Sequence, residues 1–94
     1  MDILKGKVAV ITGGSRGLGY SIAQAYAQEG AQVVIGSRSA ASVEKAIASI
    51  RAAGGEASGI ACDMGDRKQV EALAEQAIEK YGHLDIWMNN AGLS

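Results

Sequence analysis

The chain contains neither proline nor phenylalanine, and Cys62 is the single cysteine among its 94 residues. A lone cysteine excludes an intramolecular disulfide, and no other cysteine or histidine stands near it at metal-ligand spacing. We therefore expect a reducing, cytoplasmic setting and no bound metal. Alanine and glycine are abundant instead, a composition that favours a tightly wound α/β domain with short side chains.

Two kinds of long run are also missing. The nine Lys and Arg residues are scattered and the formal net charge is -1, so the sequence has no basic stripe for a nucleic-acid backbone. No stretch approaches the ~18 uninterrupted apolar residues of a membrane span, and residues 1–6 contain no apolar signal core. We expect neither nucleic acid nor membrane as a partner, and no secretion. The length suits one small globular domain.

Short apolar runs alternate along the chain with segments of helical periodicity, and glycines end the helical segments. The runs predict four strands, at residues 7–12, 31–35, 56–62 and 84–89. The periodic segments predict three helices, at residues 17–29, at residues 39–53, and from an N-cap at Asp66 to a stop at Gly82. This βαβαβαβ order predicts an α/β fold of Rossmann type, with a parallel sheet and helices on both faces.

A glycine-rich turn, Thr-Gly-Gly-Ser-Arg-Gly-Leu-Gly at residues 12–19, joins the first predicted strand to the first helix. Free backbone N–H groups and the positive end of the helix dipole converge at such a turn and attract an anion. Glycine also lets the backbone approach a pyrophosphate closely. The turn alone is also compatible with a merely tight connection, but its position between strand and helix favours nucleotide binding.

The end of the second predicted strand distinguishes NAD from NADP. NAD sites usually carry an acidic residue there for the adenosine ribose, whereas no carboxylate occurs between Glu29 and Glu44. Arg38 stands at this place, and a guanidinium binds a 2′-phosphate in a forked geometry. Arg16 in the glycine turn is a second candidate for the same phosphate. The alternative for both arginines is a solvated surface charge.

These residues together resemble the short-chain dehydrogenases/reductases, in the subgroup marked by Thr-Gly-x-x-x-Gly-x-Gly. Cys62-Asp63-Met64, Asn-Asn-Ala-Gly at residues 89–92 and the opening Leu4-x-Gly6-Lys7-Val8-Ala9 also match the family pattern, so the resemblance covers the whole chain. It implies NADP(H) as cofactor. The cofactor-binding residues that the pattern implies are Gly13, Ser15, Arg16, Gly17, Leu18, Gly19, Ser37, Arg38, Asp63, Met64, Asn90, Ala91 and Gly92.

Several of these residues have a purely structural alternative. Asp63, which in the family contacts the adenine, would otherwise be a loop residue leading to the third helix. Asn90 would otherwise brace the sheet through hydrogen bonds to backbone. We interpret Trp87 as a sheet-packing residue rather than a substrate platform, and His83 as an exposed loop residue rather than a catalyst.

No catalytic residue is predicted within the chain. The family's Ser, Tyr and Lys lie beyond the fourth strand, and none of Tyr20, Tyr26 and Tyr81 is followed four residues later by lysine. We therefore expect hydride transfer between NADP(H) and a carbonyl or alcohol to belong to a longer parent, and this chain alone to be inactive. The alternative is a stand-alone nucleotide-binding or interaction module that lacks catalysis.

A doubly wound strand order of 3-2-1-4 would leave the fourth strand at an edge of the sheet. Its apolar residues would then border an open ladder of backbone hydrogen-bonding groups. We expect self-association through this strand.

Overall fold

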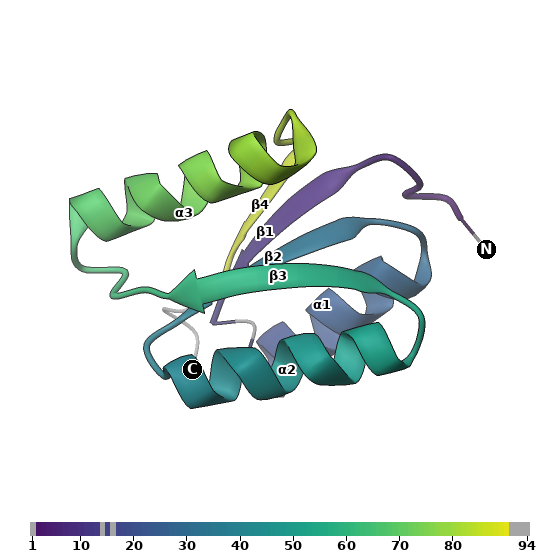
Figure 1. Ribbon diagram of the computed structural model, residues 1–94, viewed down its shortest axis with the longest axis horizontal. Coiled ribbons are helices and arrows are strands. Elements are labelled where there is room, and N and C mark those ends of the chain that lie inside the picture. Colours follow the sequence, from purple (N-terminus) through teal and green to yellow (C-terminus); the bar gives the residue numbers. More distant parts are fainter. Residues whose placement is uncertain (1, 14, 16, 91–94) are drawn as a thin grey trace.

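The computed structural model describes residues 2–13, 15 and 17–90. Its elements are β1 (Val8–Thr12), α1 (Gly17–Gln28), β2 (Gln32–Ser37), α2 (Ala40–Ala52), β3 (Glu56–Ala61), α3 (Arg67–Tyr81) and β4 (Ile86–Asn89). The four strands pair in parallel in the order β3-β2-β1-β4. Figure 1 shows α3 over one face of the sheet and α1 and α2 over the other. The Rossmann-type fold and the strand order predicted from the sequence are confirmed.

The second strand is longer than its hydrophobic run. It extends through Gly36 and Ser37, because these residues stay in register with Ile60 and Ala61 of β3. The polar end of β2 is therefore held in the sheet by its neighbour and not by its own composition. This extension places Arg38 one residue past the paired end of the strand. At β4 the difference is opposite, since pairing begins at Ile86 and not at residue 84.

The core has two layers, one on each face of the sheet, because successive strand side chains point to opposite faces. All five residues of β1 are buried, which fits the continuous apolar run of a central parallel strand. On one face, Ile11, Val33 and Ile35 pack against α1 and α2. On the other, Val8, Val10 and Val34 pack against Leu73 and Ala77 of α3.

A small residue allows α3 to approach the sheet closely. A Cβ on Gly36 would lie 2.5 Å from Cδ2 of Leu73, so this leucine occupies the space that a side chain on β2 would need. Leu73 itself is fully buried, and burial of one leucine contributes about 1.5–3 kcal/mol. The scarcity of bulky side chains in the sequence thus corresponds to close packing of helix on strand.

Side-chain caps fix where the second and third helices begin. Ser39 accepts a hydrogen bond from the backbone N–H of Ser42, and Asp66 accepts from those of Lys68 and Gln69. Each cap satisfies backbone donors that the first helical turn leaves without partners. The loops that follow β2 and β3 lead from the sheet edge into these capped helices.

Strand β4 lies at the edge of the sheet beside β1, as predicted. Its side chains alternate between half-buried and exposed, in contrast to the fully buried β1. Trp87 pairs in register with Val10 and is 37% exposed. Among the residues that the structure describes, no helix has both the length and the apolarity to cross a bilayer.

Tyr81 at the end of α3 joins this helix to β3. Its hydroxyl donates a hydrogen bond to Oε2 of Glu56 at 2.8 Å and lies 3.2 Å from Oγ of Ser58. Burial is the main reason that the pKa of Tyr81 rises from 10.0 to about 12, and the adjacent Glu56 adds to the increase while the Ser58 hydrogen bond opposes it.

This shift predicts a loss of stability at alkaline pH. Because the pKa of Tyr81 is higher in the folded chain than in the unfolded one, the stabilisation is complete below about pH 10 and is lost as the pH rises towards 12. Urea unfolding of the wild type should give a free energy that falls across this interval, and Tyr81→Phe should reduce the fall. Glu56→Gln, which keeps the acceptor and removes the charge, should lower the pKa of Tyr81 in the folded chain, so that the loss ends at a lower pH and is smaller. Equal pH dependence in all three proteins would contradict the assignment.

Candidate functional site

The glycine turn lies where β1 ends and α1 begins, at the carboxyl edge of the sheet. Gly13 and Gly17 have φ angles of 68° and 62°, in the left-handed region that favours glycine. The Gly13 N–H donates to the carbonyl oxygen of Gly36 at 2.7 Å and so holds the start of the turn against β2. Gly14 and Arg16 lie outside the described residues, so the prediction for Arg16 stays a prediction.

Gly19 marks the closest approach of backbone within the site. A Cβ on this residue would overlap the carbonyl oxygen of Gly13 and lie 2.5 Å from Nδ2 of Asn90. The first turn of α1 therefore rests directly on the glycine turn and on the end of β4. At Gly17, by contrast, a Cβ would meet nothing within 4 Å. The N-terminus of α1 therefore presents backbone without side chains next to open space, which is what a pyrophosphate requires.

Thr12 connects the carboxyl ends of β1 and β4. Its fully buried hydroxyl lies 3.0 Å from Oδ1 of Asn89 and accepts a hydrogen bond from the backbone N–H of Asn90 at 2.9 Å. Asn90 is only 4% exposed. The bracing role considered for Asn90 is therefore visible in its backbone, while its side chain faces Gly19. Thr12 was absent from the residues predicted for the site, although a polar residue directly before the glycine turn was a usable signal.

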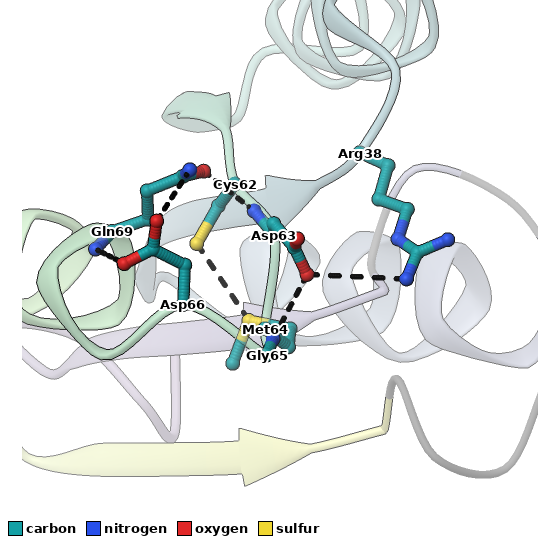
Figure 2. Close-up of polar contacts among 7 residues, drawn as sticks. All are labelled: Arg38, Cys62, Asp63, Met64, Gly65, Asp66 and Gln69. Atoms are coloured by element: carbon teal, nitrogen blue, oxygen red, sulfur yellow. Dashed lines mark hydrogen bonds and ion pairs between the residues drawn. The ribbon is translucent and has the colours of Figure 1, made fainter.

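The end of β2 meets the glycine turn through two hydroxyl groups. Oγ of Ser15 donates to Oγ of Ser37 at 2.9 Å. The next residue, Arg38, has a side chain that is 85% exposed, and its Nη2 lies 3.9 Å from Oδ1 of Asp63. Figure 2 shows this arginine reaching from its loop across to the loop after β3. The structure thus brings together two residues predicted for opposite ends of the adenosine.

The loop after β3 is held by a compact set of hydrogen bonds (Figure 2). Oδ1 of Asp63 accepts from the Gly65 N–H at 2.9 Å, and the Asp63 N–H donates to Oε1 of Gln69 at 2.8 Å. Gln69 also donates to Oδ2 of Asp66 at 3.1 Å, so the cap of α3 and the loop share one network. These hydrogen bonds make Asp63 part of the loop that leads to α3, and its side chain is nevertheless about half exposed.

Beneath this loop lies the single cysteine. Cys62 is 1% exposed, and its thiol lies 3.7 Å from Sδ of Met64. Burial raises the pKa of the Cys62 thiol, and the carboxylates of Asp63 and Asp66 raise it further. The thiol is thus kept protonated and packs as an apolar group.

The predicted site residues within the described chain lie at or after the carboxyl ends of strands. The turn after β1 and the end of β4 meet where the order of the strands reverses, which is the usual ligand site of open α/β sheets. Leu18 beside the turn is 62% exposed. Ala91 and Gly92 lie outside the described residues.

His83 lies away from this edge, in the loop before β4. Its Nε2 is 2.9 Å from the carbonyl oxygen of Gly6 and 2.9 Å from Oδ2 of Asp85, which also accepts from the Val8 N–H. This histidine is a half-exposed loop residue that joins the starts of β1 and β4. In the part of the chain described here, no three His, Cys, Asp or Glu side chains gather as metal ligands.

The fold and the turn define an open parallel α/β sheet of Rossmann type with a glycine-rich connection after its central strand. The family model for short chain dehydrogenases matches residues 7–94. The chain belongs to this family.

Individual relatives support the same family assignment. An uncharacterized oxidoreductase of Methylorubrum extorquens is 42% identical over 94 residues, covering 99% of this chain and 38% of its own length. A hydroxysteroid dehydrogenase from Escherichia coli superposes with a TM-score of 0.89 at 38% identity, over 92% of this chain and 37% of that one. A metagenomic short-chain oxidoreductase in complex with NADP gives 0.83 at 38% identity, over 89% and 38%. The chain therefore spans less than two fifths of the length of these relatives.

The close contact at Gly19 predicts the effect of a single methyl group. Helix propensity alone would favour Gly19→Ala by up to about 1 kcal/mol. Overpacking typically costs ~1–3 kcal/mol, and the obstructing oxygen belongs to backbone that cannot rotate away. Because the clash is with backbone, we take the upper part of this range, ~2–3 kcal/mol, and expect a net loss of ~1–2 kcal/mol in the free energy of unfolding measured with urea. Ser21→Ala, an exposed position of the same helix, should change stability by less than ~0.5 kcal/mol. A Gly19→Ala chain as stable as the wild type would refute the close packing.

Proposed function

We propose that residues 1–94 form an NADP(H)-binding half-domain of a short-chain dehydrogenase. The observation that carries this proposal is the glycine turn, placed at the reversal of strand order beside an arginine that follows β2 directly. The bound NADP of the metagenomic relative supports a nicotinamide cofactor for a sheet of this kind. The pyrophosphate would lie on the turn and the N-terminus of α1, and Asp63 would face the adenine.

The preference for NADP over NAD follows from the charges at the end of β2. Residues 32–39 contain no carboxylate that would bind a ribose 2′-hydroxyl or repel a 2′-phosphate. Arg38 is highly exposed, so its guanidinium can turn towards a ligand without leaving a packed position. A planar guanidinium meets two phosphate oxygens at once, which makes it a selective partner for this group.

When bound, NADP(H) supplies the hydride. This chain's own residues would bind and orient it. The backbone of the turn and of α1 would hold the pyrophosphate, and Arg38 would hold the 2′-phosphate. The hydrogen bond between Thr12 and Asn90 fixes the end of β4 beside this site. Leu18 is exposed next to the turn, and its side chain would be available to contact the bound cofactor.

Hydride transfer to a carbonyl also requires a proton, and none of the three tyrosines is placed to donate it. Tyr81 is bonded to Glu56 with a pKa of about 12, and Tyr20 and Tyr26 lie on α1 without a lysine four residues on. We therefore infer that these residues bind cofactor without turnover. The reduction of a carbonyl or oxidation of an alcohol would belong to a longer protein of the relatives' length.

Calorimetric titration tests the cofactor assignment. NADP should bind at least tenfold more tightly than NAD, a difference of ~1.4 kcal/mol. Arg38→Ala should abolish this preference by weakening NADP and not NAD. Arg67→Ala, which removes the same charge from an exposed arginine paired with Glu71 on α3, should leave it intact. Binding of neither cofactor would refute the proposal, and equal binding of both would refute the role of Arg38.

We also propose that this chain self-associates through β4. Within residues 2–13, 15 and 17–90, no strand pairs with the side of β4 that faces away from β1, and such edges pair readily with other chains. Trp87 lies on this strand and is partly exposed. It pairs with Val10, whose side chain packs on the face that α3 covers. Pairing with a second strand would remove the exposed aromatic surface of Trp87 from water, which favours association.

Sedimentation velocity tests this association at micromolar concentration. Trp87→Glu should shift the chain towards monomer, because a charge at the edge opposes strand pairing. Ile3→Glu makes the same kind of change at an exposed residue of the N-terminal turn and should leave the distribution unaltered. A wild type that sediments as a clean monomer would contradict the proposal.

A further inference from the structure

The ion pair between Arg38 and Asp63 follows from the register of two neighbouring strands. Ser37 pairs with Ala61, and the Cys62 N–H donates to the Ser37 carbonyl oxygen at 2.7 Å. Arg38 and Asp63 therefore leave the sheet side by side, just beyond the last paired residues. Their charged ends face one another across solvent, with 3.9 Å between Nη2 and Oδ1.

The two partners of this pair differ in freedom. Oδ1 of Asp63 is fixed by the Gly65 N–H, and its backbone N–H is fixed by Gln69, so the carboxylate keeps its place without help from the arginine. Arg38 is 85% exposed, and this pair is the contact that orients its guanidinium in the described structure. The short acidic side chain is the fixed anion and the long basic one the movable cation.

Resting on the function proposed above, we propose that Asp63 is a specificity-determining residue that competes with the 2′-phosphate of NADP for Arg38. In the ligand-free chain the carboxylate holds the guanidinium at the edge of the adenosine site. A 2′-phosphate must draw the arginine away and also lie near a fixed negative charge. NAD carries no such group and meets neither cost. The acidic residue thus lowers the discrimination that Arg38 creates.

The size of the effect follows from the exposure of the pair. Exposed ion pairs at such distances are weak, because water screens both charges. Removing the charge of Asp63 should therefore raise the preference for NADP over NAD by about two- to fivefold in the ratio of dissociation constants. This ratio cancels any contact that Asp63 makes to the adenine, since both cofactors share that base.

The experiment measures the ratio of NADP to NAD affinity in wild type, Asp63→Asn and Glu71→Gln. Asparagine retains an oxygen to accept from Gly65, so the loop keeps its geometry. Glu71→Gln removes an equal charge from α3, where the carboxylate pairs with Arg67. We expect the ratio to rise in Asp63→Asn and to stay constant in Glu71→Gln. An unchanged or lowered ratio in Asp63→Asn would overturn the inference.

A second background separates competition for Arg38 from simple repulsion of the phosphate. In Arg38→Ala, Asp63→Asn should raise the ratio less than it does in the wild-type background, because no guanidinium remains to be released and only repulsion between the carboxylate and the phosphate is removed. The same gain in both backgrounds would show repulsion through space and would overturn the competition.

A measurement without ligand tests the pair itself. The NMR chemical shift of the Arg38 Nε–H group should change in Asp63→Asn and remain the same in Glu71→Gln. An unchanged shift in Asp63→Asn would overturn the pairing. A wild type that binds neither cofactor would refute the proposed function and, with it, this role of Asp63. A wild type that prefers NADP, with a ratio insensitive to Asp63→Asn, would refute the role of Asp63 alone.

Discussion

The burial of β1 between β2 and β4 is the constraint from which the arrangement of the site follows. All five β1 side chains are enclosed by helices on both faces, so the strand cannot slide without moving apolar groups into water. Its register places Thr12 level with Gly36 on one side and Asn89 on the other. The glycine turn, the approach to Arg38 and the end of β4 therefore meet at one edge.

Local hydrogen bonds then convert this register into a defined site. The Gly13 N–H binds the end of β2, and the Thr12 hydroxyl binds the end of β4. Both bonds lie close to Gly19, whose missing side chain lets α1 approach Gly13 and Asn90. Loss of a buried hydroxyl such as that of Thr12 would leave backbone groups of β4 without their partner, which is more costly than the net gain from forming the bond. The site is thus stabilised by the same contacts that close the sheet.

The order of the elements and the glycine turn were predictable, because both rest on local pattern: alternating apolar runs, helical periodicity and helix-ending glycines. The end of β2 was not, since Gly36 and Ser37 have weak strand propensity and are held by pairing with β3. The hydrogen bonds of Gln69 could not be predicted from the sequence pattern either. A glutamine three residues after an N-cap usually reaches back to the cap's own N–H, yet here it accepts from Asp63, three residues further upstream. Nor could spacing reveal that Arg38 and Asp63 face one another, because this depends on the register of strands 20 or more residues apart along the chain.

The distribution of polar groups suggests a division of labour within the family fold. Among the residues that the structure describes, the carboxyl edge presents backbone donors, the hydroxyls of Ser15 and Ser37, and the exposed ion pair of Arg38 and Asp63. On the proposed function these groups would recognise phosphate, ribose and adenine. Burial raises the pKa values of Cys62 and Tyr81 in the described structure, so both groups stay protonated even further above neutral pH than they ordinarily would. Both act as packing and bridging groups between sheet and α3. The side chains proposed to recognise the nucleotide are therefore separate from the buried groups that join the sheet to α3, and on that proposal a substitution at Arg38 or Asp63 would alter cofactor choice without disturbing the core.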